Sequence, residues 1–220
     1  MAEVEQASEA APTGPDAVEV RVAACLVEKQ RTTPDVYPLS LNSLRIACNQ
    51  STNRDPVVDY DEQTVLEGLR RLALRGWSRL ASGPGGRARK YRHLLEEALG
   101  LAPPELSLLA VLMLRGPQTP GELKQRSERL HRFSDLDAVH EALDRLIEGG
   151  YVIRHQRRPG QKEERYEQVL GGGGAIAEPA ANQEFPKAPP APAEDRLGRL
   201  EAELAELRNQ VAALREALGD

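Results

Sequence analysis

Apolar residues recur at helical spacing in six segments of the chain, which fall into two sets of three. The first set predicts helices over 18–28, from Ser40 to Cys48, and from a cap at Asp61 to Gly76. The second set predicts helices over 106–115, from a cap at Thr119 through Leu130, and from a cap at Asp135 to the glycines at 149–150. The caps are expected because Asp and Thr accept hydrogen bonds from the free N–H groups of a first helical turn.

Each set of helices is followed by two short extended stretches around a turn. WSRLA (77–81) and RKYRHLL (89–95) flank a segment rich in Gly and Pro, and YVIRHQ (151–156) and ERYEQVL (164–170) flank RRPGQKE. Three helices followed by a two-stranded wing is the element order of a winged helix-turn-helix domain. Each set is therefore expected to form one such domain.

The two sets are copies of one unit. A shift of 74 residues places Leu69 on Leu143, and Arg71 on Arg145. The same shift places Trp77 on Tyr151, and one residue more places Tyr91 on Tyr166. Self-similarity at a fixed period is the signature of a repeated structural unit.

The predicted fold is mainly α with small β-hairpins, an α+β class with two tandem winged helix-turn-helix domains and a C-terminal coiled-coil helix. The expected segments are a disordered arm (1–17), winged-helix domain one (18–100), winged-helix domain two (101–170), a Gly/Pro-rich linker (171–195) and the coiled coil (196–220).

Seven apolar residues near the C-terminus alternate spacings of three and four, the seam pattern of a coiled coil. They are Leu197, Leu200, Leu204, Leu207, Val211, Leu214 and Leu218. The pattern favours a homo-oligomer; an amphipathic helix packed on the domains is the alternative. Leu at both seam positions leaves dimer and trimer open.

Four stretches carry a family resemblance: YPLSLNSLRIACNQSTNRDPV (37–57), GPGGRARKYRH (83–93), LRGPQTPGELKQRSERLHRFSD (114–135) and RRPGQKEERY (157–166). Together they make residues 18–170 resemble the YceH-like family of bacterial proteins, whose molecular role is uncharacterised. The resemblance implies tandem winged helices, in agreement with the pattern of elements. It implies no established ligand or catalytic residue.

Composition places the chain among soluble globular proteins, with 40% hydrophobic and 29% charged residues. No apolar run approaches the roughly 18 residues of a membrane span, and the acidic N-terminus lacks the apolar stretch of a secretory signal. We therefore expect a cytoplasmic protein. Cys25 and Cys48 have apolar neighbours and are interpreted as buried structural thiols rather than a disulfide or a metal pair.

The net charge of −5 hides a mildly basic folded part, because residues 18–170 hold 24 Lys and Arg against 21 Asp and Glu. The cations gather on the two wings. Wing one has Arg79, Arg87, Arg89, Lys90 and Arg92 with no acid, and wing two has Arg154, Arg157, Arg158, Lys162 and Arg165 beside two glutamates. Basic wings can contact phosphates, which gives affinity for nucleic acid without reading sequence.

The third helix of each unit argues against base reading, because these helices begin DYDEQ and SDLDAVHE. Acidic side chains there would face phosphates of like charge, whereas they stabilise the positive end of a helix. The first hypothesis is therefore a non-catalytic protein that associates with DNA or RNA through its wings. The alternative is a protein-interaction adaptor oligomerised by its C-terminal zipper.

The polar turn CNQSTNRDP has two possible roles. Asn49, Gln50, Asn53, Arg54 and Asp55 could form an exposed binding site between the second and third helices. The favoured interpretation is that they cap the second helix and fix the long turn, because Asn and Asp satisfy free backbone groups.

Nothing in the sequence indicates an enzyme. The four histidines are dispersed without metal-ligand spacing, and no nucleophile motif is present. The loop GPGG lacks the following Lys and Ser or Thr of a phosphate cradle. We expect no catalytic residue, no metal site and no cofactor.

Overall fold

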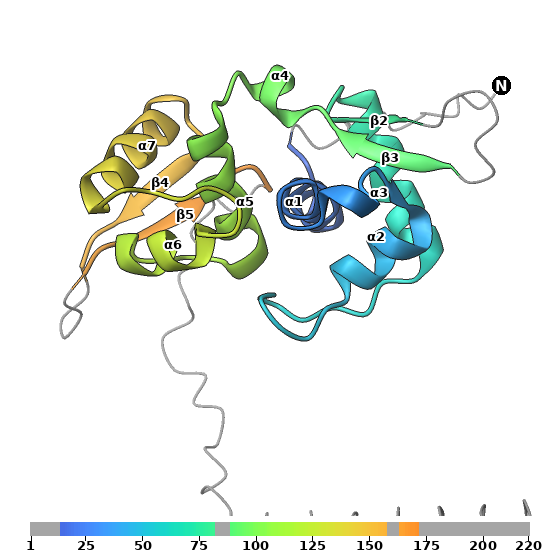
Figure 1. Ribbon diagram of the computed structural model, residues 1–220, viewed down its shortest axis with the longest axis horizontal. Coiled ribbons are helices and arrows are strands. Elements are labelled where there is room, and N and C mark those ends of the chain that lie inside the picture. Colours follow the sequence, from blue (N-terminus) through green and yellow to red (C-terminus); the bar gives the residue numbers. More distant parts are fainter. Residues whose placement is uncertain (1–13, 82–88, 158–162, 172–220) are drawn as a thin grey trace, which may run out of the picture. The chain divides into compact units, whose positions relative to one another are not determined.

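The computed structural model describes residues 14–81, 89–157 and 163–171, all within one folded unit (Figure 1). These residues form a mixed α+β structure with seven α-helices and two small antiparallel sheets. The predicted coiled coil, including all seven of its seam residues, lies outside the described residues.

The first half of the folded unit contains four α-helices and three strands. They are α1 (Ala17–Thr32), the 3₁₀ turn η1 (Pro34–Val36), β1 (Leu39–Ser40), α2 (Leu41–Cys48), α3 (Glu62–Leu74), β2 (Ser78–Leu80), β3 (Lys90–His93) and α4 (Leu95–Leu99). The second half contains α5 (Pro103–Arg115), α6 (Pro120–Ser127), α7 (Leu136–Glu148), β4 (Val152–His155) and β5 (Arg165–Gln168).

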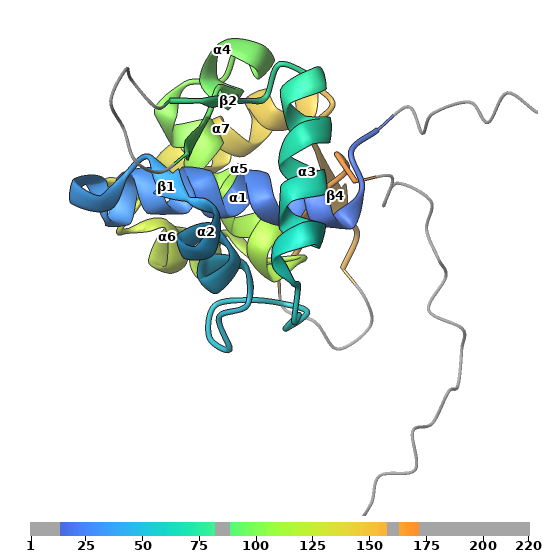
Figure 2. The same ribbon diagram turned by 90° about the vertical axis from the view of Figure 1, so that its right-hand side faces the viewer.

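Two helices, α1 and α5, lie against each other at the centre of the folded unit (Figures 1 and 2). Both are buried on all sides, over 19–27 in α1 and 105–114 in α5. Helices α2 and α3 pack on α1, whereas α6 and α7 pack on α5. A helix that is apolar all round must be covered on every face, so the apolar runs of α1 and α5 explain why the two halves share one core.

The same contacts recur in the two halves. Glu19 of α1 forms an ion pair with Arg71 of α3 at 3.4 Å, and Glu105 of α5 pairs in the same way with Arg145 of α7. The N–H of Trp77 donates to Leu72 O, and that of Tyr151 donates to Leu146 O. The 74-residue repeat is thus reproduced in the hydrogen bonds.

Both hairpins have an additional partner that sequence analysis did not predict. Strand β1 pairs with β3, which gives the order β1-β3-β2, and Leu39 lies opposite Tyr91. In the second half, Gln118 forms an isolated bridge to Tyr166, which corresponds to Tyr91 in the repeat. A two-residue strand has no alternating pattern long enough to be recognised in a sequence.

Several predicted boundaries need correction. Helix α1 runs from Ala17 to Thr32 and is longer than the predicted helix over 18–28; Asp16 caps its first turn by accepting from Glu19 N. The predicted strand over 89–95 is wrong at its end, because β3 stops at His93 and Leu95 begins α4. Leu95 is fully buried, so the chain turns there to pack its side chain in the core. Among the described residues, no helix is long and apolar enough to cross a membrane.

Candidate functional site

The outer face of the β1-β3-β2 sheet carries three described cations of wing one, Arg79, Lys90 and Arg92. Tyr91 and His93 of β3 pack inward, so Lys90 and Arg92 lie on the opposite face. Arg79 lies directly opposite Arg92 in the register of β2 and β3. Arg79 is exposed, Arg92 is half-buried, and the Nε of Arg92 has no hydrogen-bond partner within the described residues. The arrangement concentrates positive charge on one small surface.

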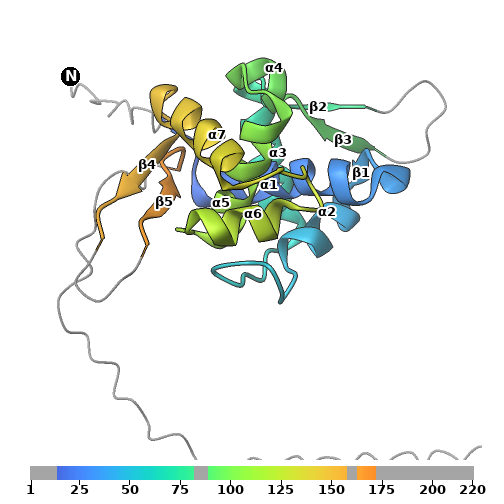
Figure 3. The ribbon, with the colours of Figure 1, turned by 60° about the vertical axis from the view of Figure 1, so that its left-hand side comes forward.

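Wing two differs, because two of its cations have partners within the same chain. Arg165 donates to Pro117 O at 2.9 Å and lies 3.2 Å from the Glu122 carboxylate of α6. Arg154 lies 3.6 Å from Glu164 on the same hairpin. Arg157 is exposed. The two hairpins project from opposite sides of the folded unit, as Figures 1 and 3 show, so they do not form one surface.

Arg87 of wing one and Arg158 and Lys162 of wing two lie outside the described residues, as do the seam residues of the coiled coil. Arg89 directly precedes β3 and is exposed.

The acidic residues that begin the third helices act as caps. Asp61 accepts from Thr64 N at 2.7 Å, and Asp135 accepts from Ala138 N at 2.8 Å. These backbone hydrogen bonds lower the pKa of both carboxyl groups below their usual value. The predicted capping role of these two residues is confirmed.

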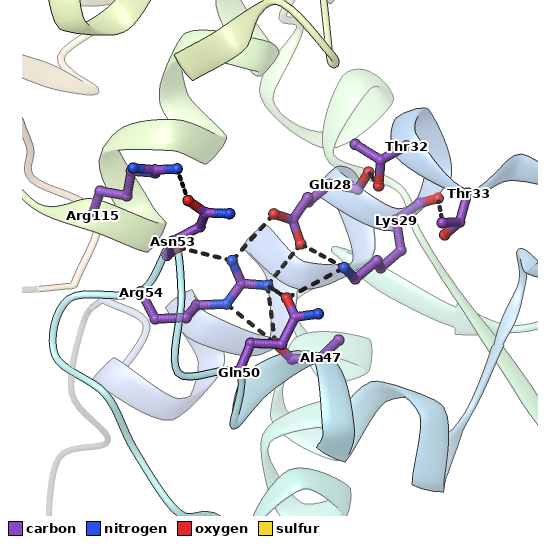
Figure 4. A network of polar contacts seen from close by, with 9 residues as sticks. All are labelled: Glu28, Lys29, Thr32, Thr33, Ala47, Gln50, Asn53, Arg54 and Arg115. Atoms are coloured by element: carbon purple, nitrogen blue, oxygen red, sulfur yellow. Dashed lines mark hydrogen bonds and ion pairs between the residues drawn. The ribbon is translucent and has the colours of Figure 1, made fainter. Parts of the chain in front are cut away.

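The polar turn after α2 is organised around Arg54, whose side chain is completely buried (Figure 4). Its Nη1 and Nη2 donate to the two carboxylate oxygens of Glu28 on α1, at 3.1 and 2.7 Å. Its Nε and Nη2 donate to Ala47 O, a carbonyl near the end of α2, at 3.1 and 2.9 Å. Gln50 accepts from Nη2 at 2.7 Å. Arg54 therefore joins α1 to the C-terminus of α2.

The ionisation of this pair follows from its contacts. Burial alone would raise the pKa of Glu28, but the hydrogen bond and the charge of Arg54 outweigh it and lower that pKa. Burial would lower the pKa of Arg54, but the hydrogen bonds to Glu28 outweigh it and raise that pKa. Both groups are therefore charged near neutral pH, as a buried ion pair requires.

The other polar residues of the turn extend the same network. Asn49 accepts from Tyr60 N at 2.9 Å and donates to Tyr60 O at 2.8 Å, which closes the loop before α3. Asn53, with a φ of 62°, accepts from Arg115 at the end of α5 (Figure 4). Asp55 donates its backbone N–H to Leu114 O at 2.8 Å. The turn thus connects both halves of the molecule.

The two partners of this turn, Glu28 and Arg115, were not predicted from the sequence. They lie 26 residues before Arg54 and 62 residues after Asn53, so no local pattern connects them. The only sign in the sequence that Arg115 belongs with this turn was that both lie in stretches that carry the family resemblance.

Two further polar groups lie inside the first half. Cys25 and Cys48 are buried and unbridged, which agrees with the predicted burial, and a hydrogen bond with Cys25 raises the pKa of Cys48. His93 lies beneath the sheet, with Nε2 2.6 Å from Gln30 Oε1 and Nδ1 accepting from Leu95 N at 3.3 Å. Burial lowers the pKa of His93 to about 4, so the ring is neutral at pH 7.

Among the described residues, no group of three or more His, Cys, Asp or Glu side chains could hold a metal ion. The clustered chemistry of this part of the chain consists instead of guanidinium groups, carboxylates and amides. Such a set can recognise anions and fix loops.

Comparison with known proteins places the chain in a family. The profile of the family described as "Protein of unknown function, DUF480" matches residues 16–161. A UPF0502 protein of Geotalea uraniireducens is 48% identical over 90% of this chain and 89% of its own length. UPF0502 proteins of Pelobacter propionicus and Citrobacter koseri are 48% and 42% identical, over 92% and 93% of this chain and 94% and 97% of their own lengths. The chain therefore belongs to the DUF480 (UPF0502) family of bacterial proteins, in agreement with the YceH-like resemblance of its sequence.

Proposed function

We propose that the chain is a non-catalytic protein of two tandem winged helix-turn-helix units that associates with nucleic acid through phosphate contacts rather than by reading bases. The order of three helices and a hairpin, repeated twice, supports the winged-helix assignment. The buried, unbridged thiols of Cys25 and Cys48 suit the reducing cytoplasm, where we propose it acts.

The observation that carries this proposal is the register of the first sheet. Arg79 and Arg92 are direct cross-strand neighbours, and Lys90 shares their face. Like charges directly opposite each other destabilise a sheet, so such a pair persists at a cost to folding. Phosphate oxygens placed between the two guanidinium groups would remove that repulsion.

Base reading is disfavoured by the charges at the start of the third helices. Glu62 and Asp137 are exposed in the first turns of α3 and α7, where a recognition helix would meet the DNA. Their charge would repel phosphates.

The test is binding of a random-sequence duplex to the full chain, measured by fluorescence anisotropy over a range of salt. The double variant Arg79→Gln/Arg92→Gln should bind more weakly and lower the salt slope by about 2, because about one counterion is released per phosphate contact. Arg70→Gln removes an exposed arginine of α3 that pairs with Glu67, and serves as the matched control. Absence of binding at about 50 mM salt would overturn the proposal.

The second candidate is an adaptor that binds a protein partner. It is favoured by Leu136, an apolar residue 46% exposed beside the acidic Asp137 at the start of α7. Pull-down from a bacterial lysate with and without nuclease separates the two functions. Partners retained after nuclease treatment favour the adaptor, and partners lost favour nucleic acid.

In either function, the C-terminal heptads would raise the effective concentration of the folded units by joining copies of the chain. We propose that they form a coiled coil. Sedimentation of the full chain against a chain ending at Leu170 tests this, since only the full chain should be oligomeric.

A further inference from the structure

A cleft lies where the two halves of the folded unit meet, between α1, the turn after α2, α5 and α6. This junction cleft has a volume of about 460 Å³. That volume lies within the range of small-molecule sites, roughly 300–1,000 Å³. Its wall includes three arginines, Arg115, Arg126 and Arg129, and its apolar lining includes Val111, Leu114 and Leu130.

The positive charge of the cleft is not balanced by its own lining. Glu28 is the one carboxylate in the lining, and both of its oxygens already bind Arg54, with Lys29 at 3.2 Å. Arg126 has one carboxylate contact, at 3.4 Å from Glu122. Arg129 is exposed and has no polar partner within the described residues. The cleft therefore carries an excess of guanidinium groups.

The neighbouring charges act on Arg115, whose guanidinium also donates to Asn53 (Figure 4). Burial lowers the pKa of Arg115, and the nearby Arg126 and Arg54 lower it further. Cations at helix C-termini are stabilised by the helix dipole, which accounts for one arginine at the end of each helix. The dipole does not account for three that line the same cleft.

The apolar lining distinguishes this cleft from a simple ion site. Val111 and Leu114 are buried residues of α5, and Leu130 is half-buried beyond α6. A pocket with an apolar wall and a few convergent charges fits an organic ligand that ends in an anionic group. Because phosphate oxygens match the forked donors of arginine, several arginines together favour phosphate.

We propose that the junction cleft binds a small organic phosphate of nucleotide size. The phosphates lie against the three arginines, and the organic part lies on the apolar wall. Because residues of α1 and of the turn after α2 line one side while α5 and α6 line the other, the ligand also ties the two halves together. The site is separate from the sheet face for which we propose nucleic-acid binding.

The test is isothermal titration of the full chain with ATP, AMP and pyrophosphate in a buffer free of phosphate and sulfate. ATP should bind at one site per chain with a dissociation constant of about 1 mM or tighter. The double variant Arg126→Gln/Arg129→Gln should weaken ATP binding at least about tenfold, since charge-assisted hydrogen bonds are lost. Circular-dichroism melting of each variant confirms that it is folded.

Arg132→Gln is the matched control, because Arg132 is exposed near the same helix and does not line the cleft. It should leave ATP binding unchanged. No saturable binding of any probe, or equal weakening by the control, would overturn the proposal. Equal affinity for ATP and pyrophosphate would overturn the role of the apolar wall.

Duplex DNA in excess should not displace ATP, and displacement would overturn the separation of the two sites. The Arg79→Gln/Arg92→Gln variant should bind ATP normally. The two proposals can therefore fail independently.

Discussion

Arg54 and Glu28 form a two-pronged ion pair, 3.1 Å from Nη1 to Oε1 and 2.7 Å from Nη2 to Oε2, that links the turn after α2 to the central helix α1. The Arg54 side chain has no exposure to solvent. Its remaining donors are occupied by Ala47 O, Asn53 O and Gln50. In this structure, the arginine of the polar turn is directed into the molecule, whereas Asn53 and Asp55 of the same turn are exposed.

Removing one partner of this pair should be strongly destabilising. We expect Arg54→Ala to lower the free energy of unfolding by about 3–5 kcal/mol, because Glu28 is left charged and largely buried. Urea denaturation monitored by circular dichroism measures this. Arg70→Ala, which breaks the exposed pair with Glu67, should cost less than about 1 kcal/mol.

A small effect of Arg54→Ala would instead favour the other role of the turn, an exposed binding site. Arg54→Lys adds a second comparison. Lysine keeps the charge but cannot donate to Glu28 and Ala47 O in the same fork, so it should recover only part of the lost stability.

Arg79→Glu should change stability and nucleic-acid binding in opposite directions. It replaces a cross-strand pair of like charges with a Glu opposite Arg92. Urea denaturation should show a gain of about 0.2–1 kcal/mol, the range of cross-strand charge pairs. Fluorescence anisotropy should show weaker duplex binding. A loss of stability would identify Arg79 as a structural residue and remove the main support for the sheet face as a binding surface.

The ends of several helices could be predicted from the sequence because they depend on neighbouring residues. Asp61, Thr119 and Asp135 each cap a helix through the N–H three residues later. The apolar runs of α1 and α5 likewise indicated buried helices. Their contact with each other could not be predicted, because an apolar surface specifies burial and not the partner that covers it.

The candidate sites were only partly predictable for the same reason. The cations of wing one are visible in the sequence, but the pairing of Arg79 with Arg92 depends on strand register. The Arg54 network and the junction cleft join residues of α1, the turn and α5 that lie far apart along the chain. Only the folded backbone brings such residues together.

The thiols of Cys25 and Cys48 should be protected in the native protein, because both side chains have no solvent exposure. Reaction with Ellman's reagent should be slow in buffer and fast in denaturing urea, since thiolates react and burial prevents access. Ala98→Cys places a thiol at an exposed position of α4 and should react rapidly in buffer. Rapid reaction of the unmodified chain would show that the core of the first half opens readily.

The free energy of unfolding should decrease as the pH is lowered through the range in which His93 of the unfolded chain becomes protonated. Burial lowers the pKa of His93 from its usual 6.5 to about 4 in the folded protein. Between these values the unfolded chain binds the extra proton, so stability is fully present above pH 6.5 and is lost as pH falls toward 4. The loss from this residue is about 3 kcal/mol.

Urea denaturation at several pH values between 5 and 7.5 isolates His93. Carboxyl groups whose pKa is lowered in the folded protein, such as Glu28 and Glu122, also reduce the free energy of unfolding when they are protonated, but only below about pH 5. His93→Gln keeps a hydrogen-bonding group beside Gln30 and should flatten the dependence of stability on pH between 5 and 6.5. His140→Gln, at an exposed position of α7, should leave that dependence unchanged. If the His93 variant retains the full slope, the acid sensitivity arises elsewhere, and the buried neutral imidazole beneath the sheet is not its source.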